Sequence, residues 1–366
     1  MKISKSQVLS LVFILVCFLS VAYLFKNLQQ NLSAQNIATG FSFLKYEAGF
    51  EIGESLIAYD SFDTYQKALF VGLLNTFKMA LVSSFFAFII GLFFGVLGIS
   101  KNRAIKSLSS NYINVTRNIP LLLQLFFWYA LFTDIFPSVR LAEPFLGITL
   151  SNRGIYFPWF TSTSVTVFFL LTITTTILLV SYFVITRLKK FKGVLWSLIN
   201  ILFLLFFLKL FMSLFSISFP ELKGFNIVGG RMVSPEYCAL FLGLTIYTGA
   251  FMAEIIRAGI LSVDKGQWEA AKSLGLSEVG VLRYVIIPQS FKVSLPPLIS
   301  QFLNLTKNSS LAVAIGYPDF VSISNTTMNQ TGQAIELVVL IMAVYLSISL
   351  LTSVILNKFG RKNYAK

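Results

Sequence analysis

The stretch LFVGLLNTFKMALVSSFFAFIIGLFFGVLG, residues 69–98, decides the fold class of this chain. Its 30 residues contain one charged side chain, Lys78. A helix rises 1.5 Å per residue, so about 20 apolar residues cross the roughly 30 Å hydrocarbon core of a bilayer. The stretch is therefore predicted to be a membrane-spanning helix.

The rest of the chain has the same apolar character. Of its 366 residues, 56% are hydrophobic and 12% are charged, about half the charged fraction of a typical soluble domain. Seven more apolar stretches are long enough to span a bilayer. The sequence thus predicts an all-α, polytopic transmembrane helical bundle with about eight spans, at 8–25, 69–98, 119–136, 164–186, 194–215, 236–258, 291–315 and 335–357.

The basic residues predict the orientation of these spans, because cytoplasmic loops are enriched in Lys and Arg. With both termini in the cytoplasm, nineteen of the 29 basic residues fall in inner segments and nine in outer segments. Acidic residues gather instead in the first outer loop. The net charge of +14 is therefore interpreted as a topology signal, and no nucleic-acid partner is expected.

The first span is predicted to be a retained membrane anchor. Lys2 and Lys5 before an apolar run resemble the start of a signal peptide. However, the run covers about 18 residues, longer than a usual signal core. It is followed by Leu24, Phe25 and Lys26 rather than by a cleavage site of small residues.

Clusters of Pro and Gly mark the boundaries between the predicted parts of the chain. The clusters at 137–158 and 220–235 flank two very apolar stretches, which indicates a helical hairpin inserted into one bundle. The predicted parts are a membrane anchor at 1–26, a periplasmic loop at 27–68, the first part of the core at 69–136, the inserted loops and hairpin at 137–235, the second part of the core at 236–357, and a cytoplasmic tail at 358–366.

Several kinds of chemistry are absent from the sequence. The chain has no His, which excludes His-based triads and His metal ligands. Its Cys17 and Cys238 have no CxxC partner, and no phosphate-binding loop is present. We therefore expect no catalytic residue, no metal site and no cofactor on this chain. A membrane enzyme would need a cluster of Asp, His or Cys at one membrane face, and none appears.

The longest inner loop, 259–290, contains signals for two short helices. Asp264 and Gln267 have capping-box spacing, which predicts a helix over 267–274 with Gly275 at the position after its C-cap. Ser277 is predicted to cap a second short helix that Pro288 ends.

Helices this short are marginal alone in water, so the first needs a surface to pack on. Trp268, Ala271 and Leu274 give it an apolar stripe. The stripe is compatible with docking on another protein and with a helix lying on the membrane surface. The spacing alone leaves both alternatives open.

The same loop resembles the EAA loop of ABC importer permeases. That motif reads EAA, three residues, G, nine residues and I-x-L-P, and Val285 and Ile287 are conservative departures at its aliphatic positions. The residues that match the motif, and that the resemblance implies in coupling to an ATPase, are Glu269, Ala270, Ala271, Gly275 and Pro288.

Flanking segments are similar to the polar amino-acid family of these permeases. They include 117–122, 247–267 and 305–311, and the resemblance extends over 65–135 and 236–357. It is strongest to the larger permease subunit of general L-amino-acid and glutamate/glutamine importers of Gram-negative bacteria. It implies a five-helix permease core, with the first span and the inserted hairpin as additions.

The resemblance also implies partners and a location. The EAA loop would contact a separate ABC ATPase subunit, which would hold ATP and Mg. A periplasmic amino-acid-binding protein would deliver the substrate, and a paralogous permease would complete a heterodimer, which the resemblance favours over a homodimer. The chain would lie among the lipids of the bacterial inner membrane and couple ATP hydrolysis by its partner to import of L-amino acids.

Polar groups inside the predicted spans are candidates for the translocation path. A charged side chain costs about 2.5–3.5 kcal/mol at the centre of a membrane helix and usually faces protein or water. The candidates are Lys78, Asn304, Lys307, Asn308 and Ser309. The two lysines among them could instead extend to the membrane surface or bond backbone carbonyls.

An ion-coupled secondary transporter is the alternative function. Proton coupling usually relies on buried carboxylates or His, and the acids Asp134, Glu254 and Glu336 lie near span ends. Glu254 and Arg257, at i and i+3, are interpreted as a structural ion pair.

Gly91 and Gly95 have the GxxxG spacing that permits close helix packing. Glycine is also common in membrane helices, so the spacing alone leaves the packing role open.

Overall fold

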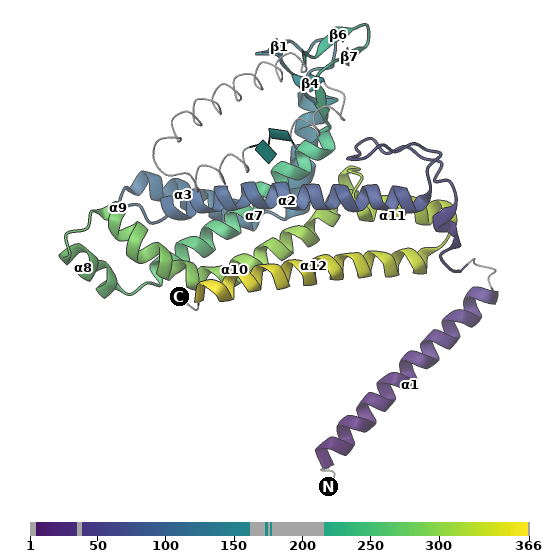
Figure 1. Ribbon diagram of the computed structural model, residues 1–366, viewed down its shortest axis with the longest axis horizontal. Coiled ribbons are helices and arrows are strands. Elements are labelled where there is room, and N and C mark those ends of the chain that lie inside the picture. The colour runs from purple at the N-terminus through teal and green to yellow at the C-terminus, as the bar shows by residue number, and fades with distance from the viewer. Residues whose placement is uncertain (1–4, 35–38, 162–172, 175, 178–215, 365–366) are drawn as a thin grey trace. The chain divides into compact units, whose positions relative to one another are not determined.

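The computed structural model describes residues 5–34, 39–161, 173–174, 176–177 and 216–364 (Figure 1). The chain divides into two compact units, one of Met1–Trp128 with Ala239–Lys366 and one of Tyr129–Cys238.

The described residues are mostly helical. The helices are α1 (Lys5–Ala34), α2 (Tyr65–Leu97), α3 (Arg103–Asn118), α4 (Leu121–Ala130), α7 (Pro235–Leu261), α8 (Lys265–Ser273), α9 (Glu278–Val281), α10 (Ile287–Asn308), α11 (Phe320–Thr331) and α12 (Ala334–Tyr364), with 3-10 turns η1 (Ser42–Lys45) and η4 (Ser309–Ile315) and π-helical turns η2 (Leu131–Ile135) and η3 (Leu282–Ile286).

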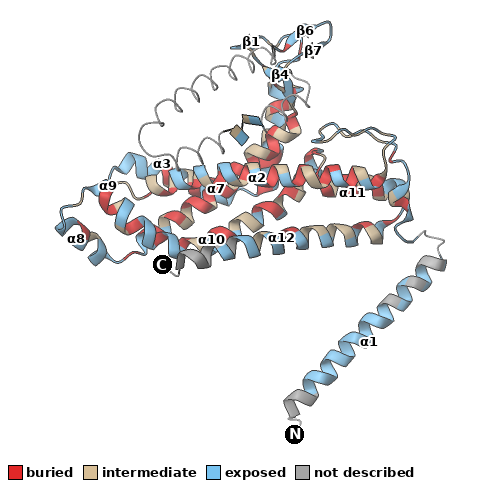
Figure 2. Ribbon diagram, viewed as in Figure 1, coloured by how far each residue is buried: buried red, intermediate tan, exposed pale blue. Residues whose placement is uncertain are grey.

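Four described helices are long and apolar enough to cross a membrane. They are Leu9–Leu28, Tyr65–Leu97, Pro235–Leu261 and Ala334–Ile355, in α1, α2, α7 and α12. These correspond to four of the eight predicted spans. Figure 2 shows that the described side chains of α1 are exposed along its length, as expected of a helix whose solvent is lipid.

The other predicted spans have different outcomes. Those at 164–186 and 194–215 lie outside the described residues, except for 173–174 and 176–177. The one at 291–315 falls on α10 and η4, and α10 is long enough to span a membrane but not apolar enough to count as a candidate span. The one at 119–136 is α4 with η2, which qualifies only if α3 is counted with it as one span broken by a 100° bend.

The C-terminal half of α2 packs tightly against α7. A Cβ on Gly91 would lie 2.6 Å from the Cβ of Met252, and one on Gly95 would lie 2.9 Å from the carbonyl oxygen of Ala253. Only hydrogen atoms fit in this space. The GxxxG spacing therefore serves close helix packing here.

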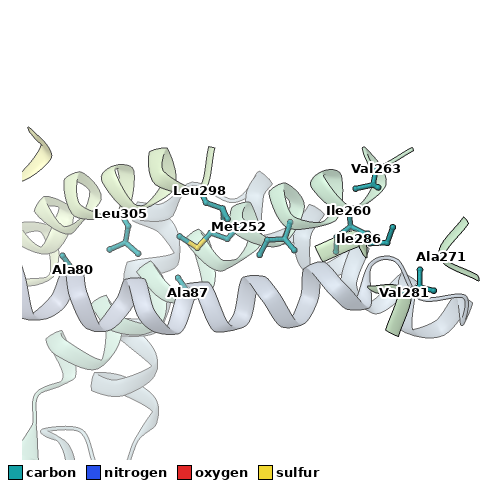
Figure 3. Packing of buried hydrophobic residues seen from close by; sticks show 11 residues of the cluster. Ala80, Ala87, Met252, Ile260, Val263, Ala271, Val281, Ile286, Leu298 and Leu305 are labelled. Carbon is teal, nitrogen blue, oxygen red and sulfur yellow. The ribbon is translucent and has the colours of Figure 1, made fainter. Parts of the chain in front are cut away.

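A hydrophobic core follows α2 from its middle toward the short helices after α7. Ala80 and Ala87 of α2, Met252 of α7 and Leu305 of α10 belong to the same buried cluster as Ala271 of α8. Figure 3 shows these side chains in a row along α2. The core of the membrane helices thus continues into α8.

The break between α3 and α4 is stabilised by specific residues. Ile119 leaves the helical conformation with φ −96° and ψ 124°, as expected before Pro120. The side-chain amide of Gln124 donates to the carbonyls of Thr116 and Ile119, at 2.9 and 3.0 Å. The side chain thus supplies donors to backbone carbonyls that have no intrahelical donor because of the bend.

The segment 39–64 folds over one end of the helices. Phe43 and Ala48 are buried in a second cluster that contains Tyr65 of α2, Phe320 of α11 and Leu337 of α12. The hydroxyl of Tyr65 donates to Gln330 at 2.8 Å.

Pro288 does not end a helix, and that prediction is wrong. It lies in the first turn of α10, which follows α9 and the π-helical turn η3. A proline is tolerated there because the first-turn N–H groups need no intrahelical acceptor.

The Tyr129–Cys238 unit contains short antiparallel strands in the two segments that the sequence predicted to be loops on either side of the inserted hairpin. Each strand is two to four residues long, too short for the alternating pattern that identifies a strand. The strands are β1 (Pro144–Phe145), β2 (Ile148–Ser151), β3 (Gly154–Phe157), β4 (Trp159–Thr161), β5 (Ser216–Ser218), β6 (Glu221–Lys223), β7 (Asn226–Val228) and β8 (Arg231–Val233), in sheets of order β1-β2-β3-β8, β4-β5 and β6-β7.

Candidate functional site

Helix α8 begins at the predicted N-cap. The carboxylate of Asp264 accepts from the N–H of Gly266 at 2.6 Å. The reciprocal half of the predicted capping box is not formed, because the side-chain oxygen of Gln267 instead accepts from Gln289 at 3.0 Å. This bond ties the start of α8 to the first turn of α10.

The C-terminal end of α8 is a Schellman turn. Gly275 has φ +80°, its N–H donates to Lys272 at 2.9 Å, and the N–H of Leu276 donates to Ala271 at 3.4 Å. A Cβ on Gly275 would meet nothing within 4 Å. The backbone conformation alone therefore requires glycine at this position.

The two sides of α8 differ in what they contact. Ala271 is 3% exposed, and half-buried Trp268 packs against the same core cluster. Glu269 and Ala270 are exposed, and Leu274 is 82% exposed at the helix end. The predicted apolar stripe is thus divided, since most of it holds α8 to this chain and Leu274 faces away.

A cavity of about 480 Å³ lies between α8, α9 and the C-terminal end of α2. Its walls include Leu97, Trp268 and Leu282. Lys101 and Glu278 also line it and form an ion pair. The Lys101 ammonium lowers the pKa of the Glu278 carboxyl, so this pair joins the α2–α3 connection to α9 at neutral pH.

Ser277 caps α9 as predicted. Its side-chain oxygen accepts from the N–H of Gly280 at 3.2 Å. Val279 of α9 and Tyr284 of η3 are 72% and 67% exposed. With Leu274 they are exposed apolar side chains on the segment that carries the EAA-like residues.

Lys78 and Ser309 both have partners within the chain. The Lys78 ammonium lies 3.5 Å from the carboxylate of Glu54, and Asn75 donates to the carbonyl of Glu54 at 2.8 Å. Ser309 is fully buried, and its hydroxyl donates to the carbonyl of Thr306 at 2.8 Å.

The other candidates lie near the end of α10. Asn304 and Lys307 are exposed on neighbouring positions of one helix face, and Asn308 is half-buried. The carbonyl of Lys307 accepts from the hydroxyl of Ser310 at 2.7 Å. Asn304, Lys307 and Asn308 therefore remain together as accessible polar groups, apart from Ser309.

The predicted ion pair of α7 is confirmed. The guanidinium of Arg257 donates to both carboxylate oxygens of Glu254, at 3.0 and 2.6 Å. This bidentate geometry joins two side chains of one helix, which is the arrangement expected of a structural pair.

The candidates chosen from sequence did not include Arg117. Its guanidinium carbon lies 4.9 Å from the ring centre of Phe251. Phe251 is ten residues before the end of α7, which is a candidate membrane span. The following Asn118 and Pro120, a helix-breaking pair, are the sequence signal that could have located this residue within the membrane.

Comparison with protein families gives one match. Residues 170–363, more than half of the chain, match the family described as "Binding-protein-dependent transport system inner membrane component". The match includes α7, the EAA-like loop, α10 and α12.

Three relatives cover nearly the whole chain. The chain is 43% identical to a general L-amino acid transport system permease protein of Rhizobium johnstonii, over 97% of this chain and 90% of the relative. It is 44% identical to a putative amino-acid ABC transporter permease protein of Escherichia coli, over 93% and 90%. It is 33% identical to a glutamate/glutamine/aspartate/asparagine transport system permease protein of Rhodobacter capsulatus, over 98% and 93%.

Proposed function

The chain belongs to the family of binding-protein-dependent transport system inner membrane components, and from this premise we propose that it imports amino acids. It is a multi-pass membrane subunit of an ABC importer, and the family implies an ATPase partner and a substrate-binding protein. An ion-coupled secondary transporter, the alternative function, is not favoured by these matches.

The proposed substrates are L-amino acids of more than one side-chain class. All three relatives above are described as amino-acid permeases, and their matches extend over at least 90% of their own lengths. A general L-amino-acid importer is the substrate class that the first relative supports. A glutamate and glutamine importer is the narrower alternative that the third supports.

We propose that α8 couples this subunit to ATP hydrolysis by a separate ATPase subunit, which binds ATP and Mg. Exposed Glu269, Ala270 and Leu274 are available to that partner, while Ala271 attaches α8 to the core of the membrane helices. Gly275 sets the turn that ends α8, and Pro288 starts the helix that leads back into the bundle. Movement of α8 would then be transmitted to α10 and α2.

The proposed orientation places α8 and both termini in the cytoplasm, as the distribution of basic residues favours. The proposed translocation path includes exposed Asn304 and Lys307 and half-buried Asn308, whose polar groups suit a zwitterion. Lys78 and Ser309 were also candidates from the sequence. Because both side chains have partners within the chain, we propose that they support the path without contacting the substrate, and that Lys78 holds the 39–64 segment through Glu54.

The complete transporter is proposed to contain this chain and a paralogous permease. Co-purification with tagged forms of this chain tests the pairing. The proposal requires a second, different permease at one copy per copy of this chain.

Reconstitution tests the proposed function. The chain is purified with its ATPase and permease partners and placed in liposomes that contain ATP in the lumen. The binding protein and radiolabelled L-amino acids are added outside. We expect uptake that requires ATP and all subunits. Uptake by this chain alone, driven by a proton or sodium gradient, would contradict the proposal.

A further inference from the structure

The second half of α3 lies at membrane depth. The hydroxyl of Tyr112 donates to the carbonyl of Ile246 at 2.7 Å, in the middle of the α7 span. The hydroxyl of Ser109 donates to the carbonyl of Phe94 at 2.7 Å, near the end of the α2 span. These contacts place α3 beside two membrane-spanning helices rather than in an aqueous loop.

One exposed face of α3 is a row of polar side chains. Ser107, Asn111, Asn114 and Asn118 recur at i, i+4, i+7 and i+11, the spacing of one helix face, and all four are exposed. The helix Arg103–Asn118 contains no acidic residue. Amides rarely face lipid, because nothing there can accept or donate a hydrogen bond. This face therefore needs water or a polar ligand.

Arg117 is a cation at the end of this row. Its guanidinium lies over Phe251 and is exposed, and no hydrogen bond or ion pair to it occurs among the residues that the structure describes. An ionisable group at membrane depth usually marks a substrate or ion path. A guanidinium is also suited to bind a carboxylate through two parallel N–H groups.

The helix break follows Arg117 directly. Ile119 and Pro120 interrupt the helix at a 100° bend. The side-chain amide of Gln124 donates hydrogen bonds to the carbonyls before the break. Broken helices at membrane depth frequently form the substrate sites of transporters, since irregular backbone is tolerated there only against protein or a water-filled space.

We propose that the polar face of α3 lines the translocation path and that Arg117 binds the α-carboxylate of the transported amino acid. The proposal rests on the proposed function, because it concerns the route of the same substrate. The occupant is identified by charge, since Arg117 is a cation, α3 contains no acidic residue, and the shared anionic group of L-amino acids is the carboxylate. The nearby carboxylate of Glu254 is bound through both oxygens by Arg257. Binding to that shared group would accept many side chains.

Thiol labelling tests the lining. In a chain with Cys17→Ser and Cys238→Ala, we introduce Asn114→Cys, Asn118→Cys or, as the matched control on the neighbouring apolar face, Val115→Cys. A membrane-impermeant thiol reagent should label the first two in the reconstituted transporter, and turnover with L-glutamine should slow that labelling. The control should stay unlabelled. Equal labelling of all three, or none at Asn114→Cys, would overturn the proposal.

Transport measurements test Arg117. With saturating binding protein, Arg117→Gln should lower the maximal rate of L-glutamine uptake roughly tenfold to a hundredfold, the scale of one charge-assisted hydrogen bond. Arg117→Lys should recover part of it. Arg140→Gln is the matched control and should leave uptake unchanged, since Arg140 is an exposed arginine outside α3 whose guanidinium also lies over an aromatic ring, that of Phe225.

Three outcomes distinguish a failure of the Arg117 role from a failure of the proposed function. Wild-type uptake by Arg117→Gln would remove Arg117 from the path. Loss of the paired permease from purified Arg117→Gln complexes would assign the residue to a subunit interface and also overturn the proposal. Absence of amino-acid uptake by the wild-type transporter would contradict the proposed function itself.

Discussion

At the scale of single residues, Gly275 shows what one backbone conformation does. The left-handed conformation at φ +80° allows the two hydrogen bonds of the turn after α8, and the space around its Cα is open. A side chain there would clash with nothing outside its own backbone. Any effect of substitution must therefore come from the turn itself, with a cost of about 1–2 kcal/mol for an ordinary residue and more for a β-branched one.

Gly275→Val should uncouple the transporter while leaving it assembled in the membrane. We expect transport-linked ATPase activity to fall severalfold, because the turn that sets the direction of α8 is lost. The measurement is ATP hydrolysis by reconstituted complexes with loaded binding protein. Gly53→Val is the control, since that glycine is also open to solvent but has no positive φ. Full coupling in Gly275→Val would argue against this geometry at the ATPase contact.

Lys307 is the second residue with a direct test. If its ammonium guides the substrate carboxylate, Lys307→Met should weaken apparent substrate affinity roughly tenfold to a hundredfold without loss of expression. Lys307→Arg should restore transport only if the site tolerates the broader guanidinium. Uptake kinetics in liposomes decide this, and normal uptake by both variants would exclude Lys307 from the path.

Residue roles were predictable where a local rule acts alone. The N-cap Asp264 and the glycine after α8 follow from spacing and backbone preference. Gln267 was not predictable, because its partner Gln289 is 22 residues away and competes with the local cap. Arg117 was missed for a similar reason, since its depth depends on how α3 packs against α7.

At the scale of elements, the contact between α2 and α7 depends on glycine. The two backbones approach until a Cβ on Gly95 would lie 2.9 Å from atoms of Ala253 and Ile256. Close contact of this kind gains dispersion energy over many atom pairs, which is the main attraction between helices in lipid.

Gly95→Val should destabilise the membrane helices. Inserting bulk into a filled contact typically costs 1–3 kcal/mol, so the thermal unfolding midpoint in detergent should fall by several degrees. Leu92→Val is the matched control, because it places the same residue in α2 at a position that is 45% exposed. An unchanged midpoint for Gly95→Val would show that the helices can separate at no cost.

Among the elements, long apolar helices were predictable, whereas the angles and contacts at their interruptions were not. Four spans follow from length and composition alone. The bend between α3 and α4 and the continuation of the chain through Pro288 into α10 depend on which backbone groups find partners. That pairing is decided by tertiary contacts such as those of Gln124.

At the scale of the whole molecule, one hydrophobic core links the membrane helices to the predicted ATPase contact. Ala80 in the middle of α2 and Ala271 in α8 belong to a single buried cluster (Figure 3). A continuous close-packed core transmits displacement instead of absorbing it. Force applied at α8 would therefore reach the centre of the bundle without passing through a loop.

The π-helical turn η3 at Leu282–Ile286 has a consequence for how this segment can change in evolution. A π-helical turn is an α-helix with one residue inserted, and each residue of an α-helix advances the angle by about 100°. The wider turn accommodates the extra residue, so deleting a single residue there would restore regular winding and leave α8 and α9 close to their present angle around the axis of α10. A deletion in the regular part of α10 would instead rotate them by about 100°, so the π-helical turn is a place where this segment can lose a residue without turning the side chains proposed to face the ATPase.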